Sequence, residues 1–400
     1  MQKNVLTHIF NRTLNYTQSQ LSITSKKANK LNVQYNMSTG ISVLSVSTNV
    51  IKNKLNYWNK IMHPIIPYYA IKSFPDPKIC SMFSHFDCAS SSEIKQVLKL
   101  NKNPNNIIFA NPSKRINDLN YASDNKVNLL TADSLEECQK IININPNNKI
   151  ILRISISEIG NVNTVFSNKF GIDNDLLCFN IIDGIMSINP QSLYGFSFHA
   201  GSGQKEVFVY EKAINKILNY INYIYSKYTD NNIRIIDIGG GFTDNFGLLK
   251  LRKIIDKYVS KNNNFIWIAE PGRYFSENSS ELFVPIISKK TKWNKTCYVI
   301  ADSIYHSFSC KVYDSITPVE YPTNDLVSFY KKQIHNFDKL EECHIFGDTC
   351  DGIDIIYSGL FPNNLNVNDI LIFPNFGAYT YASSSKFNGF EPPMLHYENY

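Results

Sequence analysis

Eight short apolar runs alternate with segments of helical periodicity, and this alternation constrains the fold more than any other feature of the chain. In order, the runs are IPYYAIK, HFDCA, IIFAN, VNLLTAD, IILRIS, YGFSFHAG, IRIIDIGGG and FIWIAEPG. Between two of them, Ile94, Val97 and Leu98 recur at helical spacing after the cap candidates Ser90 to Ser92. Strands that alternate with helices indicate a parallel sheet, and eight such strands indicate an α/β fold with a closed, TIM-like (β/α)8 barrel.

The pattern of apolar residues changes after about residue 282, from alternating strand and helix periodicity to strand periodicity alone. The stretches LFVPIISKKTKW and DILIFPNFGAYTYA are β-rich and are separated by loops of Pro, Asn and Asp, and long helical stripes are lacking. We therefore expect a barrel over residues 40–282 and a second, all-β domain over residues 283–400. Residues 1–39 are expected to form an N-terminal extension with a strand that contributes to the β domain.

The start of the chain contains no acidic residue before Asp76, whereas Lys3, Arg12 and Lys26 lie among Ser, Thr and Asn. Such a start is typical of an organelle transit peptide. A disordered, Asn-biased extension explains the same composition, because Asn and Lys are frequent throughout the chain. Both interpretations remain open.

Composition narrows the class of protein. The chain has 400 residues, a formal net charge of +6 and no dense Lys/Arg stripe, so anionic small molecules are expected as ligands as readily as nucleic acid. No apolar run approaches the length of a membrane span. Its 8 cysteines are scattered and form no CxxC pair, which argues against a zinc site or a disulfide framework and favours a reducing, cytoplasmic location.

The predicted strands end on polar or special residues, which are Lys72, Asp87, Asn111, Asp133, Arg153, His199, Gly239 to Gly241, and Glu270. In a (β/α)8 barrel, the carboxyl ends of the strands face the active site. A barrel whose rim merely contains satisfied polar groups is the alternative. It would not need a lysine, a histidine, an arginine and several acids at these points.

The chemistry of these residues matches one cofactor. Lys72 ends an apolar strand, so we expect partial desolvation and a lowered pKa, which suits Schiff-base formation with a carbonyl. Gly239 to Gly241 and Arg273 could hold a phosphate. His199 offers a flat ring, and Glu270 offers an acid for a pyridine nitrogen. Together these are the requirements of pyridoxal 5′-phosphate (PLP).

At this point the sequence resembles a known family. The stretches PYYAIKS, FDCASSSEI, KFG, GFSFHAGSG, DIGGGF, AEPGRYF, SFSCKVYDS, TCDGID and GAYTYASSSKFNGF are similar to those of eukaryotic ornithine decarboxylases, within the PLP-dependent fold type III group. The resemblance covers roughly residues 40 to 390. It implies decarboxylation of L-ornithine to putrescine and CO2 in polyamine biosynthesis.

The resemblance also implies a role for each matching residue. Lys72 would carry the cofactor, His199 would stack on its ring and Glu270 would pair with its nitrogen. The remaining cofactor contacts would be Asp87, Glu93 and Arg153 around the site, with Ser202, Gly239, Gly240, Gly241, Gly272, Arg273 and Tyr379 at the phosphate. On the substrate side, Cys350 would be the proton donor, Asp314 and Asp351 would bind the distal amine, and Tyr305 and Phe387 would border the pocket.

The implied assembly is a homodimer whose active sites are shared between subunits. Each site would join Lys72 of one protomer to the CDG loop of the other, and Lys169 and Asp354 would form an intersubunit ion pair. Binding of an antizyme is left open. No nucleic acid, membrane or metal partner is expected.

Two departures from the family pattern bear on substrate fit. The family's usual DG.YGS is DSIYHS here, so Ser303 and His306 stand where glycines are usual. The usual GPTCDG is GDTCDG, which adds Asp348 beside the proton-donor loop.

Other functions remain as alternatives. A decarboxylase of lysine or another diamino acid would use the same parts with a differently sized pocket. A non-catalytic homologue resembling the antizyme inhibitors is a further possibility, although this chain keeps Asp87, Arg153 and Arg273, which such homologues typically lose.

Overall fold

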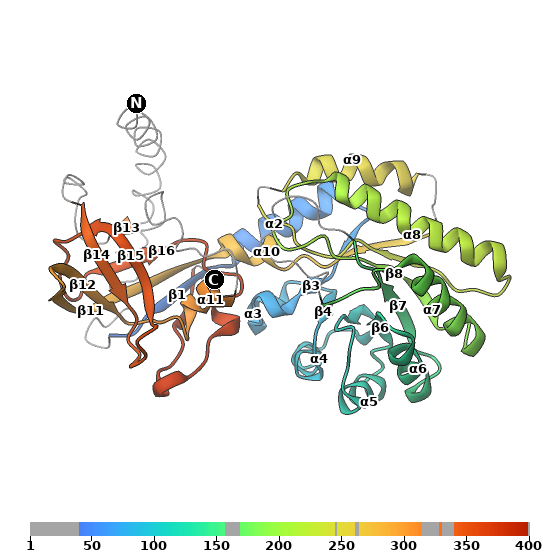
Figure 1. The fold of residues 1–400 in the computed structure, drawn as a ribbon, viewed down its shortest axis with the longest axis horizontal. Coiled ribbons are helices and arrows are strands. Elements are labelled where there is room, and N and C mark those ends of the chain that lie inside the picture. The colour runs from blue at the N-terminus through green and yellow to red at the C-terminus, as the bar shows by residue number, and fades with distance from the viewer. Residues whose placement is uncertain are drawn as a thin grey trace. The chain divides into compact units, whose positions relative to one another are not determined.

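The computed structural model describes residues 40–156, 169–244, 246–260, 264–313, 328–329 and 340–398. The chain divides into two compact units, a barrel unit of Asn49–Ser276 and a β unit that combines Met1–Thr48 with Glu277–Tyr400 (Figure 1). The expected N-terminal extension, residues 1–39, lies outside the described residues.

The barrel unit contains the eight predicted strands in the predicted order, and every pairing between neighbours is parallel. The strands are β2 (Ile66–Pro67), β3 (Tyr69–Ala70), β4 (Phe86–Cys88), β5 (Ile107–Phe109), β6 (Leu129–Ala132), β7 (Lys149–Arg153), β8 (Leu193–Ser197), β9 (Ile235–Asp237) and β10 (Ile266–Ala269). They are almost wholly buried, as expected for parallel strands covered on both faces.

The first predicted strand closes the barrel. It is split into β2 and β3 around Tyr68, whose backbone N–H donates to Ala269 O at 2.8 Å. β2 pairs with β10 on one side and β3 pairs with β4 on the other. The sheet thus returns on itself. Its interior is filled by a buried cluster, which comprises Tyr68, Ile108, Ala110, Leu129, Ile151, Ile235 and Ile268.

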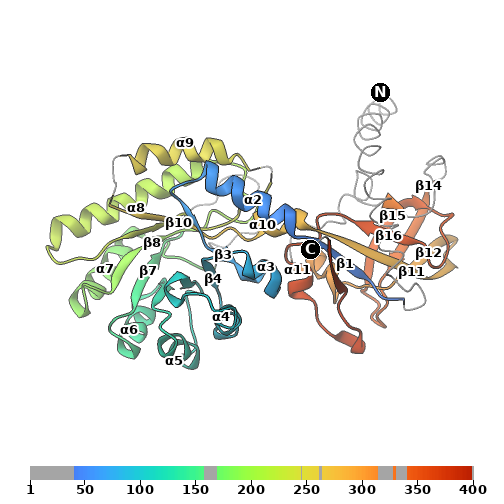
Figure 2. The ribbon, with the colours of Figure 1, turned by 180° about the vertical axis from the view of Figure 1, so that it is seen from behind.

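Helices lie outside these strands (Figure 1, Figure 2). They are α2 (Thr48–Ile61), α3 (Pro77–Ser81), α4 (Ser91–Leu98), α5 (Ile116–Asp124), α6 (Leu135–Ile144), α7 (Asp175–Ile188), α8 (Phe208–Lys227), α9 (Leu248–Val259) and α10 (Arg273–Ser276). Ser90 caps α4 by accepting the Glu93 N–H, and Ile94 and Val97 form its buried stripe, as the sequence predicts.

The β unit is built on one mixed sheet with the strand order β13-β16-β11-β12-β14-β15, to which β1 and β17 are added. Its elements are β1 (Val43–Ser47), β11 (Ser280–Lys292), β12 (Lys295–Ile300), α11 (Cys310–Tyr313), β13 (Ser328–Phe329), β14 (Leu340–Phe346), β15 (Ile355–Pro362), β16 (Ile370–Phe373) and β17 (Met394–Glu398). The long strand β11 pairs with β1, β12 and β16 (Figure 2).

The division into units differs from the expected boundaries at residues 40 and 282. β1 lies in the β unit because it pairs antiparallel with β11 and parallel with β17. The boundaries therefore fall after Thr48 and after Ser276. Within the described part of the chain, no helix is both long and apolar enough to cross a membrane.

Candidate active site at the carboxyl ends of the barrel strands

Lys72 lies in the single turn Ile71–Ser73 that follows β3. Its Nζ is 2.7 Å from Oδ2 of Asp87, which is fully buried at the centre of β4. The Lys72 side chain is 44% exposed, so the expected desolvation of this lysine is not observed. The turn after β3 leaves the ammonium accessible, and the Asp87 carboxylate stabilises its charge.

Three carboxyl groups gather beside this lysine. The pKa of Glu270, which follows β10, is raised well above its ordinary value by burial first and then by the neighbouring Asp237 and Asp87. Lys72 and Arg153 act in the opposite direction. Burial likewise raises the pKa of Asp237 at the end of β9. This acidic cluster therefore holds a proton and suits an added cation.

Asp87 has unused acceptor capacity in this cluster. Among the described residues, no hydrogen-bond donor reaches its buried Oδ1. A buried carboxylate oxygen is costly to leave unsatisfied. The donor set thus fits a ligand that brings a positive or proton-bearing group to the mouth of the barrel.

His199 presents a neutral imidazole at the same mouth. Its Nδ1 accepts the N–H of Gly201 at 3.0 Å, which leaves the ring proton on Nε2. The pKa of His199 is lowered well below its ordinary value, by burial first and then by Arg153 and Lys72. A neutral, flat ring in this position can stack on another ring.

The three glycines after β9 are required by close backbone packing. Gly239 has a φ of +67°, and a Cβ on it would lie 2.1 Å from Phe198 O. A Cβ on Gly241, whose φ is +92°, would lie 2.0 Å from Gly201 O. Any larger residue would push apart the loops that follow β8 and β9.

The same turn also offers hydrogen-bond donors. Among the described residues, the backbone N–H groups of Gly240 and Gly241 donate to no acceptor. Arg273 is buried at the start of α10 and follows Gly272, where a Cβ would lie 2.9 Å from Cβ of Ser73. Amide donors and a guanidinium on neighbouring strand ends fit a phosphate.

The other predicted barrel residues take more local roles. The Glu93 carboxylate accepts the N–H of Ala89 at 2.6 Å at the start of α4, and burial raises its pKa. Arg153 ends β7 with its guanidinium 5.1 Å from the ring centre of Phe170. Ser202 lies in the loop after β8.

The predicted substrate residues lie in the β unit. Tyr305 OH donates to Asp351 Oδ2, and the Tyr305 ring stacks on Phe387 with centroids 4.2 Å apart. The Cys350 thiol is exposed, and its backbone N–H donates to Asn388 Oδ1 at 2.9 Å.

Three further predictions concern the β unit. Tyr379 adopts a left-handed φ of 56° there. Asp314 lies outside the described residues. Asp354 is buried and accepts hydrogen bonds from Ile304 and Thr349 of its own chain, so its intersubunit pairing with Lys169 stays a prediction.

Asp237 is the site residue that sequence reasoning missed. Its Oδ1 accepts the Gly239 N–H at 2.8 Å, and it lies beside Glu270. The Glu270 N–H in turn donates to Gly239 O at 2.7 Å. An acid two residues before GGG, at the end of a predicted strand, is the signal that could have found it.

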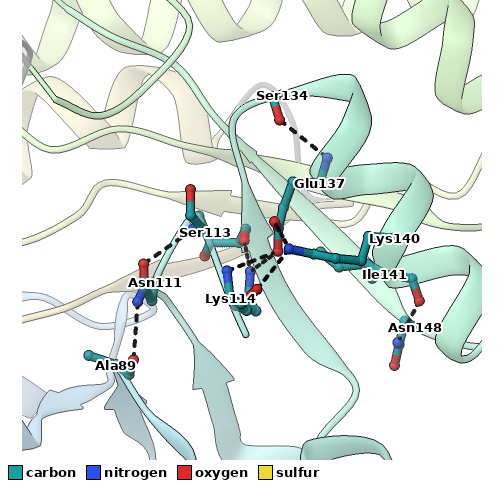
Figure 3. A network of polar contacts seen from close by, with 10 residues as sticks. Ala89, Asn111, Ser113, Lys114, Ser134, Glu137, Lys140, Ile141 and Asn148 are labelled. Carbon is teal, nitrogen blue, oxygen red and sulfur yellow. Dashed lines mark hydrogen bonds and ion pairs between the residues drawn. The ribbon is translucent and has the colours of Figure 1, made fainter. Parts of the chain in front are cut away.

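A second polar network, around Lys114, was also missed (Figure 3). Lys114 is buried after β5, where its Nζ donates to Thr131 O and lies 3.6 Å from Glu137 Oε1. Lys140 Nζ lies 2.5 Å from Glu137 Oε2 and donates to Lys114 O at 2.7 Å. Burial lowers the pKa of Lys114 to about 8. The network ties the loop after β5 to strand β6 and helix α6.

Comparison with known proteins agrees with this geometry. The family model of the pyridoxal-binding domain of pyridoxal-dependent decarboxylases matches residues 48–277. The ornithine decarboxylase of Schizosaccharomyces pombe is 33% identical over 367 residues, which cover 87% of this chain and 81% of the relative. The probable ornithine decarboxylase of Dictyostelium discoideum is 32% identical and covers 88% of this chain and 78% of the relative.

Among solved structures, the arginine decarboxylase of Paramecium bursaria Chlorella virus, bound to agmatine, matches with a TM-score of 0.81. It is 29% identical, and the match covers 90% of this chain and 97% of that one. The chain therefore belongs to the pyridoxal-dependent decarboxylases of fold type III, lyases that use pyridoxal 5′-phosphate, and within them to the eukaryotic ornithine decarboxylase family.

Proposed function

We propose that this protein decarboxylates L-ornithine to putrescine and CO2 and thereby serves polyamine biosynthesis. The observation that carries the proposal is the meeting of an accessible Lys72 with a proton-holding acidic cluster at the mouth of the barrel. Similarity to ornithine decarboxylases over 87% of the chain supports the choice of substrate.

Different barrel residues would bind different parts of the cofactor. Lys72 would hold its aldehyde carbon, and His199 would cover its ring. The Gly240 and Gly241 N–H groups and Arg273 would bind its phosphate, with Ser202 assisting. When bound, PLP supplies an electron sink for the pair released as the bond between Cα and the carboxylate breaks.

Glu270 would donate a proton to the ring nitrogen of the cofactor. Because its raised pKa keeps a proton in the acidic cluster, Glu270 can give that proton to a nitrogen placed beside it. The carboxylate left behind stabilises the resulting cation. Asp237 supports Glu270 from the neighbouring strand by fixing the Gly239 backbone, to which Glu270 donates.

On the substrate side, Asp351 would bind the distal ammonium and the exposed Cys350 thiol would deliver a proton to Cα. We further propose a homodimer in which Lys72 of one protomer works with Cys350 of the partner subunit. The departures at Ser303, His306 and Asp348 lie in the β unit and leave Lys72, Asp87 and Glu270 in place.

Rival functions have less support. A decarboxylase for a substrate with a distal carboxylate would need a cation where Asp351 lies. Retention of Lys72, Asp87, Arg153 and Arg273 favours an enzyme over a regulatory homologue. A cytoplasmic location is supported by the 8 scattered cysteines, which form no CxxC pair, as is typical of proteins in a reducing compartment.

The test is product identification with a matched pair of variants. The PLP-loaded enzyme is expected to convert L-ornithine into putrescine. Asp351→Ala should raise KM roughly 10- to 100-fold, because a hydrogen bond to a charged group is lost, and leave cofactor absorbance intact. Asp256→Ala, at an exposed position of α9, is the control and should match wild type. Absence of putrescine, or an unchanged KM in Asp351→Ala, would refute the proposal.

A further inference from the structure

Ser303 and His306 form a buried pair in the turn after β12. Ser303 is 0% exposed and His306 is 2% exposed, and Ser303 Oγ lies 3.0 Å from His306 Nδ1. The turn is closed by the His306 N–H, which donates to Ser303 O at 3.0 Å. Two polar residues thus occupy positions where the family motif usually has glycines, and they are joined through Ser303 Oγ and His306 Nδ1, whereas the buried His306 Nε2 has no hydrogen-bond partner among the described residues.

The pair holds the backbone of Tyr305. Ser303 Oγ accepts the Tyr305 N–H at 3.0 Å. On the other side, Tyr305 O accepts the Ser385 N–H at 2.8 Å and the Ser385 hydroxyl at 3.0 Å. With its ring stacked on Phe387, Tyr305 is fixed at its N–H, its carbonyl and its side chain.

Tyr305 in turn fixes Asp351. Its hydroxyl donates to Asp351 Oδ2, and this hydrogen bond is the main reason that the pKa of Asp351 is held below its usual range. Asp351 Oδ1 accepts the Ile353 N–H at 3.2 Å. Each oxygen of the Asp351 carboxylate therefore already receives one hydrogen bond from its own chain.

This arrangement distinguishes two kinds of cation. A carboxylate offers about four acceptor positions, and two of those of Asp351 are occupied, one on each oxygen. A guanidinium binds best through two parallel hydrogen bonds to both oxygens, so it would need both remaining positions, one on each oxygen, at the same time. An ammonium is a compact point charge that is satisfied by single acceptors.

We propose that the buried Ser303–His306 pair is a positioning device for Tyr305, and that the Tyr305 hydroxyl makes Asp351 selective for a primary ammonium over a guanidinium. This inference rests on the proposed function, because that function assigns Asp351 to the substrate's distal amine. Ser303 and His306 act through Tyr305 and touch no substrate.

The test measures binding and turnover in three variants of the PLP-loaded enzyme. Tyr305→Phe removes only the hydroxyl and keeps the ring on Phe387. Ser303→Ala removes the acceptor of the Tyr305 N–H, and the double variant combines both changes. Ser309→Ala is the matched control, since Ser309 is 1% exposed in the same turn and hydrogen-bonds only to Ser383 through its side chain among the described residues.

Calorimetric titration with putrescine and agmatine gives the affinity ratio of the two cations. Tyr305→Phe should lower the putrescine-to-agmatine ratio about tenfold or more and raise KM for ornithine with little change in kcat. Ser303→Ala should shift both quantities in the same direction by less. The double variant should match Tyr305→Phe, because Ser303 acts through Tyr305. Ser309→Ala should match wild type.

The two hypotheses fail in different ways. If the wild-type enzyme makes no putrescine from ornithine, the proposed function is wrong. If Tyr305→Phe leaves the affinity ratio unchanged, or the effects of Ser303→Ala and Tyr305→Phe simply add, the inference is wrong even in a working ornithine decarboxylase. Should Ser303→Ala not fold, Ser303→Gly replaces it, since glycine is usual in the family motif at this position.

Discussion

The Lys72 ammonium lies 2.7 Å from the carboxylate of Asp87, and the two residues belong to adjacent elements on the closing side of the barrel. The lysine is 44% exposed while the acid is fully buried. The accessible Lys72 ammonium is thus fixed by a carboxylate that is itself buried in strand β4. This arrangement positions the amine without shielding it from an incoming carbonyl.

Reductive trapping should label Lys72 and leave Lys114 unlabelled. Both lysines follow barrel strands, and burial lowers the pKa of Lys114 to about 8, which favours its neutral, nucleophilic form. The Lys114 side chain is 0% exposed, however, so a cofactor aldehyde cannot reach it. Borohydride reduction of the PLP-loaded protein followed by peptide mapping should find the cofactor on the peptide that contains YYAIKS.

Lys72→Ala is the control for this labelling and should abolish it. A label on the peptide that contains NPSKR would show that accessibility does not decide which lysine reacts. The site assignment would then have to move to the loop after β5.

The contribution of the Asp237–Glu270 cluster to the stability of the apoprotein should fall as pH rises above about 4, whereas the lowered pKa values of His85, His199 and His306 act in the opposite direction below about 6.5. In the folded state the pKa values of Glu270 and Asp237 are raised, whereas in the unfolded chain they are about 4. Between these values the cluster binds more protons in the folded state, so its contribution to the free energy of unfolding decreases with increasing pH. Urea unfolding of the apoprotein at several pH values measures the slope.

Asp237→Asn should flatten this slope by up to about 1.4 kcal/mol per pH unit, because one proton fewer is bound on folding. The amide oxygen can still accept the Gly239 N–H, so the glycine turn is preserved. The pKa values of Asp302 and Asp348 are raised by burial to about 7 and about 6. These two residues contribute equally to the pH slopes of the wild type and of Asp237→Asn, so they cancel in the comparison. Identical slopes would contradict the acidic cluster.

Glu137→Gln should destabilise the barrel by about 3 kcal/mol, since it leaves the buried Lys114 without its charged partner. Glu136→Gln is the matched control, because Glu136 is the exposed neighbour in the same first turn of α6. Thermal or urea unfolding of the three proteins measures the difference. Equal stability of the two variants would mean that the Lys114–Glu137 pair contributes little.

The barrel could be predicted from the sequence because its strands are buried on both faces and read as continuous apolar runs. The polar residues at the strand ends could be predicted as well, because each of them follows directly after such an apolar run. The position of β1 could not be predicted, because its partners β11 and β17 lie far along the chain and no local sequence pattern indicates these pairings. The split of the first strand at Tyr68 is likewise set by pairing with both β10 and β4.

Electrostatic details of the site were less accessible to sequence reasoning. The exposure of Lys72 depends on the turn after β3 and on its contact with Asp87, neither of which a strand pattern specifies. The contact between Ser303 Oγ and His306 Nδ1 depends on burial of both side chains in the same turn, which no local pattern specifies. Their departure from the family pattern was visible, but its consequence for Tyr305 was not.

Mixing two inactive variants should restore activity if the sites are shared. Lys72→Ala and Cys350→Ala homodimers are each expected to be nearly inactive. After subunit exchange half the dimers are mixed and each has one intact site of two, so recovery should approach about a quarter of wild type. No recovery despite demonstrated exchange would place Lys72 and Cys350 in a site made by one chain.

Competition between substrates tests the central claim most directly. The PLP-loaded enzyme is given equimolar ornithine, lysine and arginine, and the early ratio of putrescine, cadaverine and agmatine reports the ratio of kcat/KM values. Ornithine should exceed lysine by at least about tenfold, because one extra methylene in a fitted pocket costs roughly 1–3 kcal/mol, and agmatine should be negligible. Cadaverine or agmatine as the main product would contradict the assignment of this chain as an ornithine decarboxylase.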